Sequence, residues 1–200
     1  VPNEFWRKLN EKENKELNMN TFDSDHIISY NAITHQNEKN VKMAEKIQYF
    51  YNELIKKQNQ SSKKSNVKID EWEELNDHWK EENIYAARHL VYKMKYINHE
   101  IVPENDKRDA VDITELDDNT LELLAKIEHQ RWSIRKYING YIPGNVTEKA
   151  FRDTAKIHKD LVDWDDLTSE EKEKDYISFV NEEILKEAGL KVVKIEEEEK

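Results

Sequence analysis

Two tetrapeptides of one pattern constrain the fold of this chain more than any other feature: Trp72-Glu73-Glu74-Leu75 and Trp164-Asp165-Asp166-Leu167. Each follows a segment with helical periodicity and precedes a charged segment of helical character. A pattern that recurs along a chain is typical of a repeated structural unit, and such repeats decide how the whole fold is interpreted. The tetrapeptides therefore predict a fold built from two related helical units.

The two units align with two different offsets. Residues 44–51 match residues 125–132 at an offset of 81, and residues 72–83 match residues 164–175 at an offset of 92. The second unit is thus longer by eleven residues, and the extra length falls in the loop around Gly140. The matched stretches are short, so chance similarity between amphipathic helices is the alternative explanation.

The composition favours helices over sheet. The chain has only three Gly and three Pro in 200 residues, which leaves few of the turn signals that a many-stranded sheet needs. Hydrophobic content is low, at 36%, but five Trp, nine Tyr and five Phe supply large apolar surfaces for a core. We therefore expect an all-α fold of two helical repeats packed together, with at most a short terminal strand.

The periodic segments divide the chain into five parts. These are an N-terminal arm or helix (1–39), a first unit (40–98), a connector (99–118), a second unit (119–195) and an acidic tail (196–200). Apolar residues at spacings of three and four predict a helix from about residue 40 and another over 119–139, which Gly140 ends.

The C-terminal part carries a helix start signal. Thr168 and Glu171 form a capping-box sequence, in which each side chain can bond the main chain of the other residue. The helix that they open is expected to run to Gly189, and residues 190–195 are expected to form a short terminal strand.

Charge and residue usage exclude several classes of function. A net charge of −11 opposes binding to the phosphate backbone of nucleic acids. The absence of Cys excludes disulfides, thiolate catalysis and Cys-based zinc sites. No run of about eighteen apolar residues and no signal peptide are present, so we expect a cytoplasmic chain without direct membrane insertion. The first residue is Val rather than Met, which is compatible with the C-terminal part of a longer protein.

The second unit contains a series of short motifs in a fixed order. In chain order these are Leu124-Ala125-Lys126-Ile127-Glu128-His129-Gln130-Arg131-Trp132, Gly140-Tyr141, His158-Lys159-Asp160-Leu161-Val162-Asp163-Trp164-Asp165-Asp166-Leu167 and Glu171-Lys172-Glu173-Lys174-Asp175. In this order and spacing, residues 120–193 resemble the ryanodine-receptor (RyR) domain, a small helical repeat found in ryanodine receptors and in many bacterial proteins. Lys159 and Asp163 depart from the family, which commonly has Pro at both places.

The first unit resembles the same family weakly. Gln48 stands where the helix of the family has a His, and the Gly-aromatic turn is missing. The resemblance implies a regulatory or ligand-sensing module of a larger bacterial or phage-related system. Its implied ligand is an anionic, nucleotide-like molecule such as an ADP-ribose derivative, and no cofactor is implied.

The candidate ligand-binding residues follow from the resemblance and from helix spacing. They are His129, Arg131, Trp132, Arg135, Tyr141, His158, Trp164 and, from the first unit, Arg88. A planar aromatic beside guanidinium groups suits base stacking and phosphate pairing. The alternative is structural: the Trp residues are packing anchors, the Arg residues pair with surface carboxylates, and the His residues bond main-chain carbonyls.

Catalytic motifs are absent from the sequence. It contains no nucleophile elbow, no His-Glu-x-x-His helix and no phosphate-cradling Gly loop, and two His without a third ligand make a metal site improbable. We therefore expect no enzyme. The alternative function is protein–protein interaction or homo-oligomerisation, for which Trp6, Tyr49 and Phe50 are candidates if they are exposed.

Overall fold

The computed structural model describes residues 22–61, 68–146, 151 and 154–196, with the main chain alone over residues 22–37. The chain divides into two compact units, residues 1–39 and 40–200. Of the first unit, the structure describes the beginning of helix α2 (Phe22–Ser61), which continues into the second unit. Trp6 lies outside the described residues.

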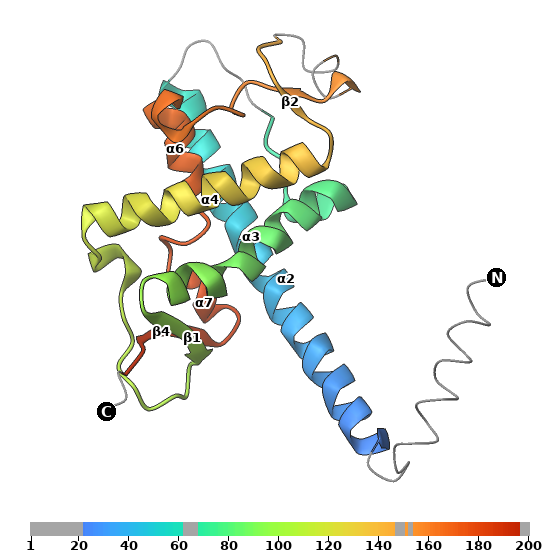
Figure 1. Cartoon of the computed structure of the whole chain (residues 1–200), viewed down its shortest axis with the longest axis vertical. Coiled ribbons are helices and arrows are strands. Elements are labelled where there is room, and N and C mark those ends of the chain that lie inside the picture. The colour runs from blue at the N-terminus through green and yellow to red at the C-terminus, as the bar shows by residue number, and fades with distance from the viewer. Residues whose placement is uncertain (1–21, 62–67, 147–150, 152–153, 197–200) are drawn as a thin grey trace, which may run out of the picture. The chain divides into compact units, whose positions relative to one another are not determined.

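The second unit is mostly helical but contains two small sheets (Figure 1). After α2 come the 3₁₀ turn η1 (Trp72–Glu74), α3 (Asp77–Tyr96), β1 (His99–Pro103), η2 (Ile113–Glu115), α4 (Asp118–Ile138) and β2 (Ile142–Pro143). The chain continues through β3 (Ile157–His158), η3 (Trp164–Asp166), α6 (Ser169–Tyr176), α7 (Glu183–Lys186) and β4 (Leu190–Lys194). The expectation of an all-α fold with at most a terminal strand is therefore too narrow.

The terminal strand was predicted correctly, but its partner was not. β4 pairs antiparallel with β1, from His99 opposite Lys194 to Pro103 opposite Leu190. β1 lies in the segment that we expected to be a connector without sheet. Its residues Ile101 and Val102 are β-branched and pack over the core, which suits a half-buried strand. The second sheet is a two-residue parallel pair between β2 and β3.

The two tetrapeptides adopt the same local structure. Trp72–Glu74 and Trp164–Asp166 each form one 3₁₀ turn, and the N–H of the following Leu donates to the Trp carbonyl in both. Each turn leads into a capped helix: Asn76 accepts from the Trp79 N–H at the start of α3, and Thr168 and Glu171 form the predicted capping box of α6. The turn η2 leads into α4 in the same way, so this geometry is a general means of starting a helix in this chain.

Helix α4 ends where the sequence predicts. Gly140 has φ of 83°, which glycine adopts at little cost. Its N–H donates to Tyr137, and the N–H of Tyr141 donates to Lys136, which together form a Schellman motif. This turn directs the chain away from the axis of α4 and toward β2.

The helix that begins at Thr168 ends earlier than predicted. α6 stops at Tyr176, and α7 starts only after Asn181, whose side chain accepts from the N–H of Glu183. The intervening turn carries Ser178 and Phe179 into the interior, where both are almost fully buried. Burial of these two side chains therefore interrupts the continuous helix that the sequence suggested up to Gly189.

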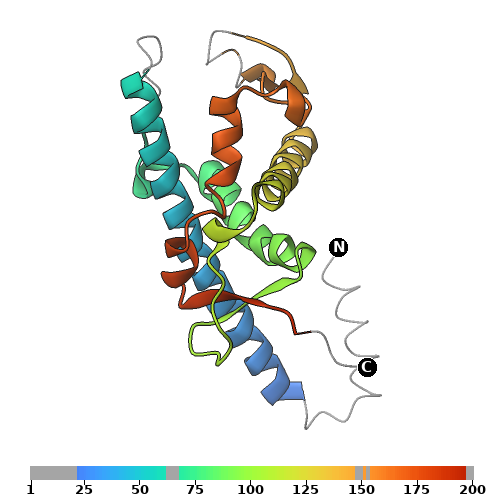
Figure 2. The ribbon, with the colours of Figure 1, turned by 90° about the vertical axis from the view of Figure 1, so that its left-hand side faces the viewer.

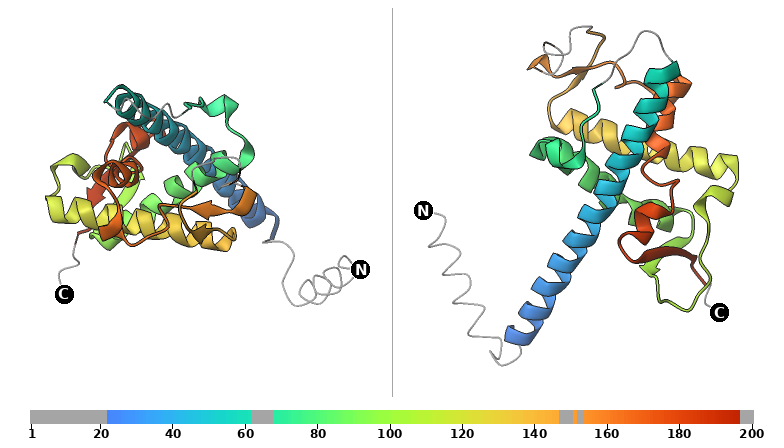
Figure 3. Two further views of the ribbon diagram at one scale, coloured as in Figure 1. Left: turned by 90° about the horizontal axis from the view of Figure 1, so that it is seen from above. Right: turned by 180° about the vertical axis from the view of Figure 1, so that it is seen from behind.

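The core lies where α2, α3, α4 and the C-terminal segment meet. Its members include Met43, Ala44, Ala87, Leu90, Met94, Leu124, Ala125, Phe179 and Val192. Within the second unit α6 lies between α2 and α4 (Figure 2), and Gln58 near the end of α2 donates to the Glu170 carbonyl of α6 (Figure 3). No helix of the described part of the chain is long and apolar enough to cross a membrane.

Candidate functional site

Helices α3 and α4 pack antiparallel and supply most of the candidate site. Lys93 near the end of α3 meets Glu128 in the first half of α4, whereas Glu82 near the start of α3 meets Arg135 near the end of α4. Polar groups thus line the contact between the two helices at both ends. The two ends differ in what surrounds these groups.

A group of aromatic side chains gathers at the end of α4. The ammonium of Lys136 lies 4.8 Å from the ring centre of Trp79, 5.0 Å from that of Tyr141 and 5.9 Å from that of Trp132. His158 of β3 meets Trp132 edge-on, with ring centres 4.8 Å apart. We call these four rings and Lys136 the aromatic site.

Lys136 is almost completely buried, with 1% of its surface exposed. Its ammonium lies 3.9 Å from Oε1 of Glu82, a long ion pair, and the same oxygen accepts a 2.9 Å hydrogen bond from Nε of Arg135. Much of the environment of this ammonium is therefore the negative faces of aromatic rings, which attract a cation electrostatically. The sequence reasoning named neither Lys136 nor Trp79.

Arg135 lies at the edge of the aromatic site. Its guanidinium carbon is 3.6 Å from the ring centre of Tyr85, and a second nitrogen donates to Glu81 at 3.3 Å. Arg88, which is exposed, lies over the same Tyr85 ring at 5.8 Å. The two predicted arginines from different helices thus meet at one tyrosine.

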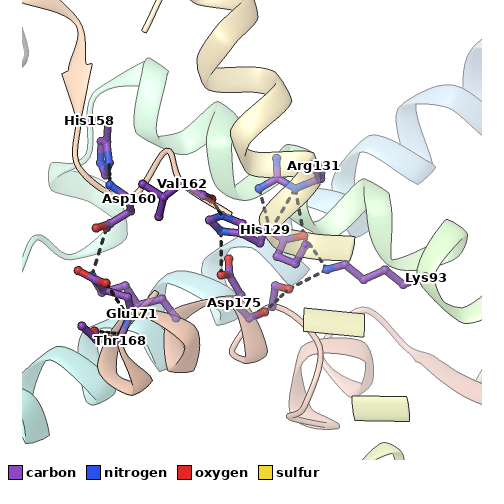
Figure 4. A network of polar contacts seen from close by, with 12 residues as sticks. Lys93, His129, Arg131, His158, Asp160, Val162, Thr168, Glu171 and Asp175 are labelled. Carbon is purple, nitrogen blue, oxygen red and sulfur yellow. Dashed lines mark hydrogen bonds and ion pairs between the residues drawn. The ribbon is translucent and has the colours of Figure 1, made fainter. Parts of the chain in front are cut away.

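Arg131 lies elsewhere, in a buried ionic network in the middle of α4 (Figure 4). It donates to both carboxylate oxygens of Glu128 at 2.8–3.1 Å. Lys93 also pairs with Glu128, at 2.7 Å, and donates to the Ser178 hydroxyl at 2.8 Å. The structure therefore directs the Arg131 guanidinium toward this network rather than toward the aromatic site.

The charges of the network reinforce one another. Burial tends to raise the pKa of Glu128, but Lys93 and Arg131 outweigh it and hold that pKa at about 2. Burial lowers the pKa of Lys93, and Glu128 opposes this effect. Glu128 is thus the carboxylate that stabilises two buried cations.

His129 joins three segments of the second unit. Its Nε2 lies 2.9 Å from the Val162 carbonyl, and its Nδ1 lies 3.3 Å from a carboxylate oxygen of Asp175 on α6 (Figure 4). Its ring stacks on Trp132 at 5.7 Å and meets Trp164 at 6.0 Å. His129 therefore connects the interior of the fold to the aromatic site.

Trp164 is buried and serves as an anchor. Its indole N–H donates to Glu122 at 3.1 Å, and Lys172 lies over its ring at 5.2 Å. At the equivalent place of the first unit, Lys80 lies over Trp72 at 5.8 Å. The ring of Trp164 contacts that of His129 and no ring of the aromatic site directly.

The connection made by His129 has a counterpart in the first unit. Gln48 donates to the Asp70 carbonyl at 3.0 Å and accepts from the Asn83 amide at 2.8 Å. These three residues precede His129, Val162 and Asp175 by 81, 92 and 92 positions, which are the offsets of the sequence alignment. We call Gln48, Asp70 and Asn83 the first joint, and His129, Val162 and Asp175 the second joint.

The described residues contain no group of three or more His, Asp or Glu side chains that could hold a metal ion. Of the predicted interaction residues, Tyr49 is half exposed, and Phe50 packs partly against the core. No family model matches the chain, and a comparison with curated proteins finds no match. The resemblance to the RyR domain thus depends on the motifs and their order alone.

Proposed function

We propose that this chain is a non-catalytic, RyR-like regulatory module that binds an anionic, nucleotide-like small molecule, for example an ADP-ribose derivative, at the aromatic site. The observation that carries the proposal is the position of the Lys136 ammonium beside the rings of Trp79, Trp132 and Tyr141. Aromatic faces stack on bases, and cations pair with phosphates. The aromatic site offers both within one short stretch of α4 and its neighbours.

The carboxylates around the site are compatible with an anionic ligand. Glu82 is buried and pairs with Arg135, but Glu81 is 61% exposed and contacts Arg135 at 3.3 Å. An exposed ion pair of this kind contributes little to stability, so a phosphate can replace Glu81 at the guanidinium at small cost. Arg135 and Lys136 would then carry one more positive charge than the single carboxylate of Glu82.

Exposed aromatic surface supports the base-binding part of the proposal. Trp79 is 41% exposed, and Tyr85 beside Arg135 is 40% exposed. A large ring that is held by a cation on one side and reaches solvent on another gives a base a place to stack. Arg88, over Tyr85, would add charge at the edge of the site.

A binding screen tests this function directly. The purified chain is melted in the presence of ADP-ribose, NAD, and linear and cyclic mono- and dinucleotides, and any hit is titrated by calorimetry. A ligand at a hundred times its Kd adds about 2.7 kcal/mol of stability, which is visible as a higher Tm. A well-folded chain whose Tm is unchanged by every nucleotide would contradict the proposal.

Two matched variants locate the site once a ligand is found. Lys136→Met removes the cation of the aromatic site and keeps a long, unbranched side chain. Lys126→Met removes the same charge from α4 at an exposed place, where the lysine pairs with Glu122. We expect at least a tenfold weaker Kd for Lys136→Met and less than a twofold change for Lys126→Met. Equal affinities in the two variants would move the site elsewhere.

Exposed apolar residues on α4 favour protein–protein interaction as the second candidate. Ile134, Tyr137 and Ile138 follow at spacings of three and four and are 58%, 50% and 77% exposed. Such a stripe suits contact with another helix. Sedimentation at several protein concentrations distinguishes this role, because self-association depends on concentration whereas ligand binding does not.

A further inference from the structure

The second joint has an unusual requirement for protons. The Val162 carbonyl accepts hydrogen bonds and cannot donate, so Nε2 of His129 must carry a proton. The other ring nitrogen, Nδ1, faces the Asp175 carboxylate, which also only accepts when it is ionised. Both contacts are therefore satisfied only if the His129–Asp175 pair holds one proton more than a neutral imidazole beside a carboxylate.

Burial makes this requirement consequential. The side chains of His129 and Asp175 are 7% and 14% exposed, so water gives little compensation for a lost hydrogen bond. Burial disfavours the charged imidazolium, but the hydrogen bonds to Asp175 and Val162 outweigh it and raise the pKa of His129. Burial raises the pKa of the Asp175 carboxyl as well. Both shifts keep the extra proton on the pair.

Charged groups from every neighbouring segment act on this pair. Lys93 of α3 lowers the pKa of Asp175, whereas Glu128 of α4 raises it. Asp160, in the loop after β3, raises the pKa of His129. Arg131 faces Glu128 and neutralises part of its charge. The local balance therefore favours retention of the proton.

The first joint serves as an internal comparison. Its amide side chains donate to the Asp70 carbonyl and accept from Asn83 without any ionisable atom. An amide keeps its protons across the whole physiological pH range. Equivalent positions of the two units thus have the same connectivity, but only the second depends on a titrating group.

We propose that His129 and Asp175 form a proton-operated latch that fastens α6 and the Val162 segment to α4 and thereby regulates the aromatic site. When the pair releases its proton, the lone pair of Nδ1 faces the Asp175 carboxylate, and this contact becomes repulsive. The 158–164 segment, which carries His158 and Val162, then loses its attachment to His129, and Trp132 loses the imidazolium stacked on it. The latch itself follows from geometry, whereas its regulatory effect rests on the proposed ligand function.

The sign of the pH dependence follows from the direction of the shifts. A group with a raised pKa in the folded state contributes stability that is fully present below its unfolded pKa, about 6.5 for His. That stability is lost as the pH rises through the raised value. We expect the unfolding constant of the second unit to increase by up to about tenfold per pH unit in this window.

The decisive variant copies the first joint into the second. His129→Gln combined with Asp175→Asn keeps a donor for Val162 and an acceptor for the amide, as Gln48 and Asn83 do. Urea unfolding is measured from pH 5.5 to 9 for the wild type, the double variant and a control, His99→Gln. His99 contacts the Ile97 carbonyl outside the latch. We expect the pH dependence to persist in the wild type and the control, and to flatten in the double variant.

Hydrogen exchange locates the effect without a ligand. After correction for the chemical exchange rate, the amides of α6 and of residues 158–164 should lose protection as the pH rises in the wild type and keep it in the double variant. Uniform loss across the second unit, or the same loss in both proteins, would overturn the latch. If the double variant folds poorly, NMR titration of His129 in the wild type decides, because an ordinary pKa near 6.5 would also overturn it.

Ligand binding separates the latch from its regulatory role. For any nucleotide found in the screen, we expect a Kd at least threefold weaker at pH 8.5 than at pH 6 in the wild type and a constant Kd in the double variant. A latch that exchanges as expected while Kd stays constant would refute the regulatory link alone. Absence of any ligand would refute the proposed function and leave the latch standing.

Discussion

The two joints solve one structural problem with different chemistry. Gln48 and Asn83 hold the η1 turn against α2 through neutral amides, whereas His129 and Asp175 hold the η3 segment against α4 through ionisable groups. The fold therefore does not need charge at this place. Buried charge is costly to desolvate, so its concentration in the second unit points to a role other than holding the helices together.

The contrast extends along the two equivalent helices. At the offset of 81, Ile47 and Ile55 of α2 correspond to Glu128 and Lys136 of α4, and all four are buried. Apolar side chains fill these positions in the first unit, and charges fill them in the second. The two charges differ again, because Glu128 is paired with two cations at short range, whereas Lys136 lies mostly among aromatic rings.

The largest effect is expected from Glu128→Ile, which copies Ile47 into the second unit. Lys93 and Arg131 would lose their carboxylate and remain as buried cations, which costs about 3–5 kcal/mol. Urea unfolding at pH 7 measures the loss. The triple variant with Lys93→Met and Arg131→Phe, the latter copying Phe50, should recover most of it. A triple variant as unstable as Glu128→Ile would mean that the second unit requires its charges to fold.

Acid sharpens the same comparison without a mutation. The pKa of Glu128 is held at about 2 in the folded chain, below its ordinary value of 4.5. A lowered pKa contributes stability that is present above pH 4.5 and lost as the pH falls toward 2, on the order of 3 kcal/mol. Unfolding measured from pH 5 to 2 should show this loss in the wild type and a smaller one in the triple variant. Equal slopes would place the acid sensitivity on other carboxylates.

A smaller effect on stability is expected from Lys136→Met, which places an apolar side chain where the first unit has Ile55. The variant loses the attraction of three rings and avoids the desolvation of an ammonium, and Glu82 keeps Arg135 as its partner. We expect a change within about 1 kcal/mol in urea unfolding. A loss as large as that of Glu128→Ile would show that Lys136 is a structural ion rather than part of a binding site.

The sequence predicts those parts of the fold that depend on local signals. The α4 helix, its glycine stop, the capping box at Thr168 and the final strand all follow from residues within a few positions of each element. The strand β1 does not, because its partner β4 lies about ninety residues away. The early end of α6 also escapes local reasoning, since it depends on the burial of Ser178 beside Lys93.

The candidate site was predicted unevenly for the same reason. Helix spacing and the Gly140 turn bring Trp132 near Tyr141 and His158, but only tertiary packing brings Trp79 of α3 to the same place. Lys136 did leave a signal, because it is a charged residue on the buried stripe of α4, aligned with Ile55. A comparison of the two units position by position would have singled it out.

The smallest effect on stability, and the sharpest test of what the charges are for, is expected from Glu81→Gln. Its ion pair with Arg135 is long and exposed, so its loss should change the free energy of unfolding by less than about 0.5 kcal/mol. The same change removes the carboxylate that competes with a ligand phosphate for the guanidinium. We therefore expect a Kd about twofold to fivefold tighter for any nucleotide that binds. Glu53→Gln, which removes an equally exposed charge beside Lys56 on α2, controls for the change in net charge. If both variants tighten binding equally, only the overall charge matters; if Glu81→Gln weakens binding, Arg135 needs Glu81 for its orientation and the phosphate must lie elsewhere.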